Sequence, residues 1–275
     1  SHHDMGNPEV LILNNPDNPT GTMRSPEQNR VLAEFCREQE LMVISDEIYA
    51  RTAFDDVPFA SFARYYPEGT IVTGGLSKDL SLGGWRFGVA VVPPTRGGKT
   101  LAKAMATIAT NVWSCVAAPI QYAALVAYSG DSDIGDYVKL CSEMHGIRTR
   151  YLYDLMVRLG VQCVKPSGGF YIFPCFDIWR ERLADIGISN DEELALHLLE
   201  NYEIAALPGS AFNSVRDFCL RISSSFIDLG TDEQADSLVE AFREDPDPQR
   251  FIQNHHPRLQ KVAERLGEFV QELNR

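Results

Sequence analysis

Short apolar runs bounded by turn residues recur through the N-terminal part of the chain. They are too short for typical helices and rich in branched side chains. The pattern therefore predicts buried strands over residues 9–14, 41–45, 70–73 and 88–92. Strands that alternate with helical connections in this way are typical of a mostly parallel sheet covered by helices.

A helix is expected between the first two strands. Ser25 offers an N-cap, Pro26 suits the first helical position, and Gln28 can complete a capping box. We expect its apolar stripe to consist of Val31, Leu32, Phe35 and Cys36. Residues 61–64 favour a further short helix.

Helical patterns dominate beyond Pro94. Helices are expected over residues 100–110, 117–128, 137–159, 192–202, 232–243 and 257–274. Two strands, over 161–164 and 170–173, would flank the glycine turn 166–169, and a third strand is expected over 218–222. This mixture predicts a second, smaller α+β domain.

Polar side chains follow three successive predicted strands of the first part. Asn18 comes after the first strand, Asp46 and Tyr49 after the second, and Lys78 after the third. Ligands of open α/β sheets bind outside the carboxyl ends of the strands. The pattern therefore predicts a ligand site in which these residues take part.

Lys78 lies in a stretch rich in glycine and hydroxyl residues, 73–88. One interpretation is a solvated loop lysine. The other is an amine that forms a covalent imine with a carbonyl cofactor, for which a lysine at the end of a buried strand is well suited. Arg86 in the same stretch is either a surface arginine or a phosphate clamp.

The other candidates also have two interpretations. Asp46 is either a helix cap or ion-pair partner, or it holds a proton on a ring nitrogen. Asn18 either makes an Asx turn or, with Tyr49, donates to a phenolate oxygen. Arg221, at the end of a predicted strand, is either a strand-end charge or a bidentate carboxylate clamp.

The composition limits the kinds of molecule that the protein is expected to bind. The chain has 275 residues and a net charge of −13, which argues against nucleic acid or an anionic membrane as the main partner. Six cysteines are scattered without a C-x-x-C pair, which favours reduced thiols in a cytoplasmic protein over disulfides or a metal site. No apolar run reaches membrane-spanning length, and residues 1–6 have the look of an expression tag.

Several segments together resemble the class I/II aminotransferases of fold type I, in order and spacing, over roughly residues 8–243. These segments are NNPDNPTG at 14–21, SDEIY at 45–49, LSKDL at 76–80 with GWRFG at 84–88, PSGGFY at 166–171, PGSAF at 208–212 and LRIS at 220–223. The resemblance implies a pyridoxal 5'-phosphate enzyme that moves an amino group between an amino acid and a 2-oxo acid. A related lyase or aminocyclopropane-carboxylate-synthase-like enzyme, and a catalytically silent interaction module, are the alternatives.

The resemblance also implies roles for single residues. Lys78 would form the internal aldimine and shuttle the substrate proton, and Asp46 would pair with the pyridinium nitrogen. Asn18 and Tyr49 would contact the ring hydroxyl. Arg86, with Ser77, would bind the phosphate. Arg221, with Asn18 beside it, would bind the substrate carboxylate, and no metal is expected.

Further expectations follow from the resemblance. Asn18–Pro19 would be a cis bond, and Gly75 replaces a serine that contacts the phosphate in many relatives. Relatives have well over a hundred residues before the first motif, so we expect a truncated protein with a partial large domain at 7–130. A small C-terminal domain would cover 131–244, and a linker and terminal helix 245–275. We expect weak cofactor binding by the isolated chain, and a homodimer.

Overall fold

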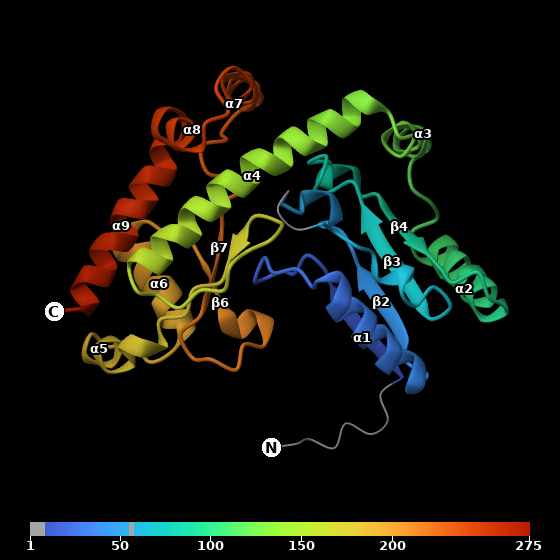
Figure 1. Cartoon of the computed structure of the whole chain (residues 1–275), viewed down its shortest axis with the longest axis horizontal. Coiled ribbons are helices and arrows are strands. Elements are labelled where there is room, and N and C mark those ends of the chain that lie inside the picture. The colour runs from blue at the N-terminus through green and yellow to red at the C-terminus, as the bar shows by residue number, and fades with distance from the viewer. Residues whose placement is uncertain (1–8, 55–57) are drawn as a thin grey trace. The chain divides into compact units, whose positions relative to one another are not determined.

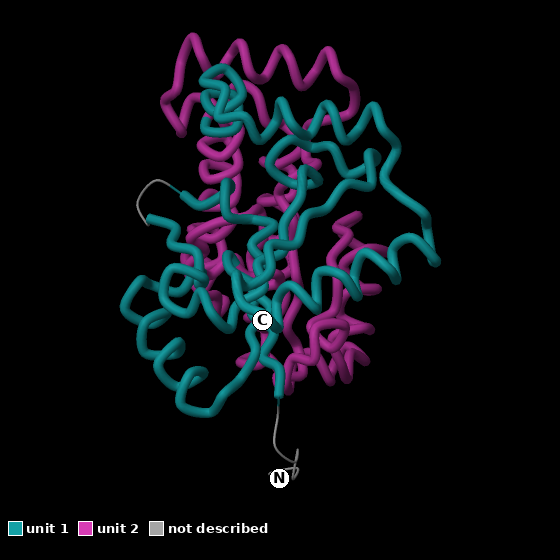
Figure 2. The backbone as a smooth tube through the Cα atoms, turned by 90° about the vertical axis from the view of Figure 1, so that its right-hand side faces the viewer, with its two compact units in different colours: residues 1–16, 23–139 teal, residues 17–22, 140–275 magenta. Residues whose placement is uncertain are grey.

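The structure, a computed structural model, describes residues 9–54 and 58–275 (Figure 1). The expected tag lies outside the described residues. The chain divides into two compact units (Figure 2). The first unit comprises residues 1–16 and 23–139, and the second comprises residues 17–22 and 140–275. A short N-terminal segment thus belongs with the C-terminal unit.

The first unit contains a four-stranded sheet in the order β1-β2-β3-β4. The strands are β1 (Val10–Asn14), β2 (Met42–Asp46), β3 (Thr70–Gly75) and β4 (Gly88–Val91). β1, β2 and β3 are parallel, whereas β4 is antiparallel to β3. All four predicted strands and the mostly parallel sheet are confirmed.

Helix α1 (Pro26–Glu38) connects β1 to β2 and begins at the predicted N-cap. Its buried residues are Asn29, Ala33 and Cys36, which share one face at helical spacing. Val31 and Phe35, expected in the buried stripe, are 55% and 51% exposed. The prediction was wrong for these two residues, because apolar residues extend around the helix beyond its buried face, whereas the predicted Cys36 is buried and Leu32 packs against the core.

The capping box of α1 supports a first prediction. The Ser25 hydroxyl accepts a hydrogen bond from Gln28 N at 3.1 Å, and Ser25 N donates to Gln28 Oε1 at 2.8 Å. Ser25→Ala is expected to lower the free energy of unfolding by about 1 kcal/mol, because a backbone donor loses its partner. Urea titration measures this loss, and Ser25→Asp, which can still cap, is the control. An unchanged stability in Ser25→Ala would contradict the role of the cap.

Short helical turns and longer helices complete the first unit. The 3-10 turns are η1 (Ala50–Thr52), η2 (Phe62–Arg64) and η3 (Gly83–Trp85). The helices are α2 (Arg96–Val112), α3 (Ala118–Ala127) and the start of α4 (Ser132–Arg158), as predicted. The boundary between the units falls inside α4, after Lys139.

The second unit has an antiparallel sheet in the order β5-β7-β6. The strands are β5 (Tyr171–Ile172), β6 (Leu207–Pro208) and β7 (Leu220–Ser223). The strand predicted over 161–164 is reduced to one bridge, Gln162 to Cys175, because the following turn diverts the chain.

Helices make up most of the rest of the second unit. They are η4 (Asp177–Trp179), α5 (Arg180–Asp185), α6 (Asp191–Tyr202), η5 (Gly209–Phe212), α7 (Asp232–Glu244), α8 (Pro248–His255) and α9 (Pro257–Leu273). α5 and α8 were not predicted. α8 starts within the segment expected as a linker, because Asp247 caps it and Pro248 suits its first position.

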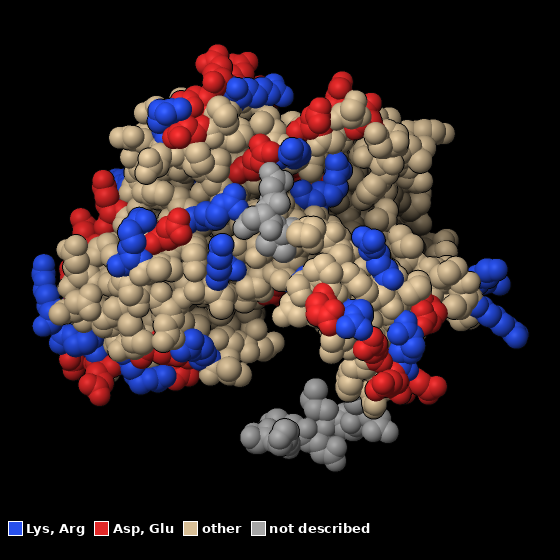
Figure 3. Space-filling model, in the orientation of Figure 1, with Lys and Arg blue, Asp and Glu red and all other residues tan. Residues whose placement is uncertain are grey.

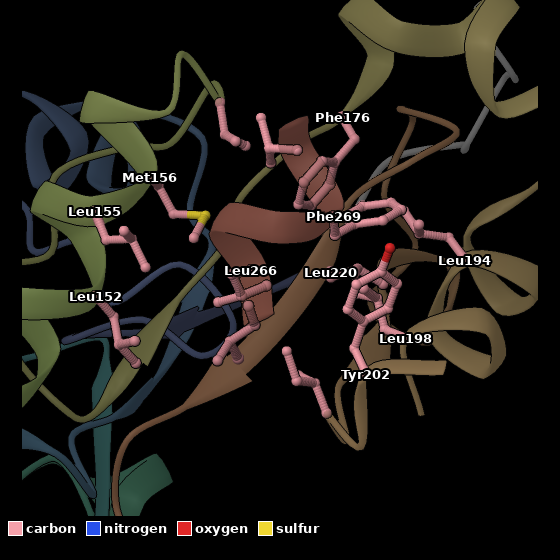
Figure 4. Packing of buried hydrophobic residues seen from close by; sticks show 14 of the residues in the cluster. Leu152, Leu155, Met156, Phe176, Leu194, Leu198, Tyr202, Leu220, Leu266 and Phe269 are labelled. Atoms are coloured by element: carbon pink, nitrogen blue, oxygen red, sulfur yellow. The ribbon is translucent and has the colours of Figure 1, made fainter. Parts of the chain in front are cut away.

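The core of the second unit joins α4, α6, β7 and α9 (Figure 4). Its fully buried side chains include Leu152, Phe176, Leu198, Leu220, Leu266 and Phe269. Each such side chain stabilises the fold by about 1.5–3 kcal/mol through burial. The terminal helix α9 is therefore part of this core.

Arg148 and His256 are buried polar residues of the second unit. Arg148 Nη2 donates to the carbonyl oxygens of Ser224 at 3.1 Å and Ser225 at 2.9 Å, and so holds the segment after β7. Burial lowers the pKa of His256 from 6.5 to about 4, and the charge of Arg148 adds to this, while Asp228 opposes it.

A pH dependence of stability follows. The folded protein keeps His256 neutral down to about pH 4, whereas the unfolded chain takes up the proton near pH 6.5. The contribution is fully present above that pH and is lost on acidification, by about 1.4 kcal/mol per pH unit between the two values. Urea unfolding at pH 7 and pH 5 measures the loss. His256→Gln is expected to show a smaller loss, and an equal loss would contradict the assignment.

The surface of the protein carries charged side chains of both signs. On the face seen in Figure 3, acidic and basic side chains are interspersed, and the whole chain carries a net charge of −13. Within residues 9–54 and 58–275, no helix has both the length and the apolar character needed to cross a membrane. No group of His, Cys, Asp or Glu in the same residues is arranged to hold a metal ion.

Candidate functional site

The carboxyl ends of β1, β2 and β3 lie side by side. Asn14 is opposite Asp46, and Asp46 is opposite Thr73. Asn14 Nδ2 and Asn15 N both donate to the Asp46 carbonyl oxygen, at 3.1 Å and 3.0 Å. These bonds fix the strand ends, so Asp46 projects from a rigid edge of the sheet.

The Asp46 carboxylate has only neutral donors around it. Oδ1 accepts hydrogen bonds from Thr73 Oγ1 and Ile48 N, each at 3.3 Å. No basic side chain among the described residues lies within ion-pair distance of this half-buried carboxylate. A carboxylate in this state is able to hold a proton on the nitrogen of a bound ring.

Lys78 follows β3 by a short turn. Its Nζ lies 5.8 Å from the centre of the ring of Tyr49, and Tyr49 is buried. The lysine is half-buried, and none of the described carboxylates forms an ion pair with it. An amine held against an aromatic ring without a carboxylate partner is free to react with a carbonyl group.

Gly75 explains a departure from the family pattern. A Cβ at this position would lie 2.7 Å from the Phe87 carbonyl oxygen, so no side chain fits between β3 and the start of β4. The serine expected from relatives is therefore sterically excluded in this backbone.

The segment between β3 and β4 holds the two phosphate candidates, Ser77 and Arg86. Ser77 is half-buried, and Arg86 is exposed with φ of 54°. Arg86 Nη1 donates to the Gly83 carbonyl oxygen at 2.7 Å, which closes η3 and leaves the other guanidinium donors for a ligand.

An ion pair beside Lys78 was missed from the sequence. Asp79 is buried, and its carboxylate lies 3.3 Å from Arg51 Nη1. Burial raises the pKa of Asp79, and Arg51 opposes that rise. The pair ties the Lys78 loop to η1. In the sequence, the only indication of this ion pair was an acidic residue directly after the lysine.

In the second unit, Arg221 of β7 is held between aromatic rings. Its guanidinium carbon lies 4.5 Å from the ring centre of Tyr171 and 4.8 Å from that of Phe212. Nη1 donates to Asn18 Oδ1 at 2.9 Å. The buried Nε has no hydrogen-bond acceptor among the described residues, so this site has a donor left for a ligand carboxylate.

Asn18 reaches Arg221 because the loop 17–22 is bound to the turn 166–169. The Gly21 carbonyl oxygen accepts hydrogen bonds from Ser167 N at 2.7 Å and Gly168 N at 3.1 Å. Gly21 has φ of 69°, and a Cβ there would lie 2.6 Å from the Tyr171 carbonyl oxygen. Glycine is therefore required in this motif.

The predicted cis bond at Asn18–Pro19 is wrong. The cis bond lies at Asn15–Pro16 instead. The loop around Pro19 closes through Asp17, whose backbone N donates to the Thr22 carbonyl oxygen at 2.8 Å.

The predicted site residues thus form two groups. Asp46, Tyr49, Ser77, Lys78 and Arg86 lie in the first unit, and Asn18 and Arg221 lie in the second. Tyr171 and Phe212 belong to recognised motifs, but their contact with Arg221 was not predicted. In the sequence, this contact was indicated by an aromatic residue at the end of each motif.

Known proteins match most of this chain. Residues 2–242 match the family model described as aminotransferase class I and II. An aspartate aminotransferase of Geobacillus stearothermophilus is 34% identical over 227 residues, 81% of this chain and 55% of that protein. One of Bacillus subtilis is 31% identical over 251 residues, 90% of this chain and 58% of that protein.

Solved structures agree with the sequence matches. The aromatic aminotransferase from Pyrococcus horikoshii is similar with a TM-score of 0.76 and 26% identity, over 97% of this chain and 61% of that one. The chain therefore spans somewhat over half the length of the relatives that it matches.

Proposed function

Because this chain belongs to the class I and II aminotransferases, whose cofactor is pyridoxal phosphate, we propose that it transfers an amino group between an amino acid and a 2-oxo acid. The observation that carries the proposal is Lys78. It is a half-buried amine without a carboxylate partner among the described residues, and it follows the strand next to Asp46. Asp46 and the free Arg221 Nε have the chemistry that the cofactor and a substrate carboxylate require.

The cofactor, when bound, supplies a protonated ring that withdraws electrons from the substrate carbon. In this proposal Asp46 keeps the proton on the ring nitrogen, and Tyr49 and Asn18 donate to the ring hydroxyl. Ser77 and Arg86 bind the phosphate. Lys78 would hold the cofactor through its amine, and the same amine would take up the proton of the substrate Cα.

Arg221 is proposed to bind the substrate carboxylate, with Asn18 beside it. Stacking between Tyr171 and Phe212 fixes the plane of the guanidinium. A fixed plane favours bidentate binding of a carboxylate, because both donors are oriented before substrate arrives. Arg221 would therefore bind the carboxylate of every amino-acid substrate in the same way.

We also propose that the first unit contributes to the cofactor-binding domain and that the second unit contains the small domain expected over 131–244. We further propose that the protein is a cytoplasmic homodimer. Large apolar side chains are exposed on and beside α2 and α3, among them Val112 and Tyr122, which supports association. The free cysteines fit a reducing compartment. Sedimentation velocity tests the dimer, and a monomer at all concentrations would contradict it.

Chemical trapping tests the proposed function. The protein is mixed with pyridoxal phosphate, reduced with borohydride and mapped by mass spectrometry. Because we expect weak binding, the cofactor is added in excess, and the expected result is an adduct on Lys78 that is absent from Lys78→Ala. Lys99→Ala, an exposed lysine of α2, is the matched control and should leave the adduct unchanged. Equal labelling of several lysines would refute the assignment of Lys78.

A further inference from the structure

Two cysteines of the second unit face each other across neighbouring segments. Cys175 and Cys219 are antiparallel bridge partners. Their pairing continues the register of β5 and β7, because equal numbers of residues separate them from the paired Ile172 and Ile222. The two side chains therefore lie on the same face of the sheet.

The backbone hydrogen bonds around the pair define its geometry. Phe176 N donates to the Phe218 carbonyl oxygen at 2.8 Å, and Leu220 N donates to that of Pro174 at 3.0 Å. These bonds flank the cysteines, so the cysteines form a non-hydrogen-bonded pair. Cα atoms in such pairs are about 4.5 Å apart, with the side chains close together. That separation lies within the range of about 4.4–6.8 Å found for disulfides.

Both thiols are buried beside a turn of the chain. Both are free cysteines, and Cys175 and Cys219 are 3% and 2% exposed. A Cβ on Gly209 would lie 2.9 Å from the Cys219 Cβ, so the turn that begins at Gly209 packs closely against Cys219. Val215, just beyond it, is 97% exposed. A local opening of this surface turn would admit a small molecule.

The surroundings distinguish the two thiols. The hydrogen bond from Cys175 lowers the pKa of Cys219, and Ser214 and the charge of Arg216 add to this, while burial and the charge of Asp177 oppose it. The hydrogen bond to Cys219, together with burial, raises the pKa of Cys175. Cys219 is therefore the first of the two to form a thiolate, which is the reactive species.

We propose that Cys175 and Cys219 form a reversible disulfide when the protein meets hydrogen peroxide. The Cys219 thiolate attacks a peroxide oxygen, the O–O bond breaks, and hydroxide leaves to become water. Cys175 then loses its proton and attacks the sulfur of the Cys219 sulfenic acid, so that the S–S bond forms and a second water leaves. The peroxide takes up the two electrons that the thiols lose. This inference does not depend on the proposed function.

The disulfide would join the two segments at the residue directly before β7. Bonds between directly paired strand residues are close to the lower limit of disulfide geometry, and deviations from ideal geometry make a disulfide easier to reduce. We therefore expect a dithiol to reopen it.

Peptide mapping tests the proposal on the whole chain. Cys115 is exposed, so Cys115→Ser provides a background free of intermolecular bonds. The protein is treated with equimolar hydrogen peroxide, alkylated under denaturing conditions and digested without reduction. The expected result is one intramolecular link to the Cys219 peptide, which disappears after dithiothreitol.

Variants assign the second cysteine. Cys163 and Cys175 share the tryptic peptide 159–180, because Lys165 precedes a proline. Cys163→Ser is expected to keep the link and Cys175→Ser to lose it.

Two results would overturn the proposal. One is full alkylation of both thiols in the oxidised wild-type chain, and the other is a link that survives Cys175→Ser. The wild-type result stands even if a variant does not fold.

Discussion

Lys78→Ala is expected to lower the rate of transamination by at least about 10²–10⁴-fold, the usual contribution of a general acid–base group. The variant loses both the covalent attachment point and the amine that moves the substrate proton. Single-turnover kinetics with an amino acid and pyridoxal phosphate measure the change. The loss should appear in the chemical step, since the proposed carboxylate clamp Arg221 is untouched.

Lys78→Arg tests whether the lysine contributes its positive charge or its reactive amine. Arginine keeps the positive charge, but its guanidinium does not give up a proton in proteins. We expect this variant to be as inactive as Lys78→Ala, whereas Lys99→Ala should retain full activity because Lys99 is exposed on α2. Substantial activity in Lys78→Arg would mean that the lysine contributes only its charge.

Arg221→Lys is expected to lower kcat/KM by roughly 30- to 1000-fold, which corresponds to about 2–4 kcal/mol of lost stabilisation. Lysine keeps the charge but loses the planar fork and the stacking on Tyr171 and Phe212. The loss should be similar for every amino acid, because each carries the same carboxylate. Steady-state kinetics with several amino donors measure it.

Arg180 offers a matched control. Its guanidinium also lies over an aromatic ring, 5.1 Å from the centre of the Phe218 ring, but it is exposed and paired with Asp217 at 2.6 Å. Arg180→Lys should change kcat/KM by less than about twofold, since exposed ion pairs contribute little. Equal effects of the two substitutions would argue against a clamp at Arg221.

Local patterns predicted much of the fold. The strand runs at 9–14 and 41–45 are continuous and apolar, as is usual for parallel strands, although Val10, Ile12 and Met42 are exposed in this structure. The Ser25 capping box marks a helix start within a few residues. The antiparallel direction of β4 was not predicted. Strand direction depends on the length and path of the connection from β3 to β4, and no local sequence pattern indicates it. The buried face of α1 was mispredicted because Val31 and Phe35 are as apolar as its true core residues.

The candidate site was predicted as a set of residues but without its supports. Lys78, Asp46 and Arg221 belong to motifs that resemble those of the class I/II aminotransferases, and this resemblance identified them. The Arg51–Asp79 pair and the stacking of Arg221 on Tyr171 and Phe212 join residues far apart in the chain. Such contacts arise only when the fold closes, and the same holds for the facing thiols Cys175 and Cys219.

A crystal structure of the protein grown with pyridoxal phosphate tests the central claim most directly. The account predicts continuous density from Lys78 Nζ to the cofactor, with the Asp46 carboxylate within about 2.6–3.2 Å of the ring nitrogen. Density joined to another lysine, or a ring nitrogen that faces no carboxylate, would contradict it.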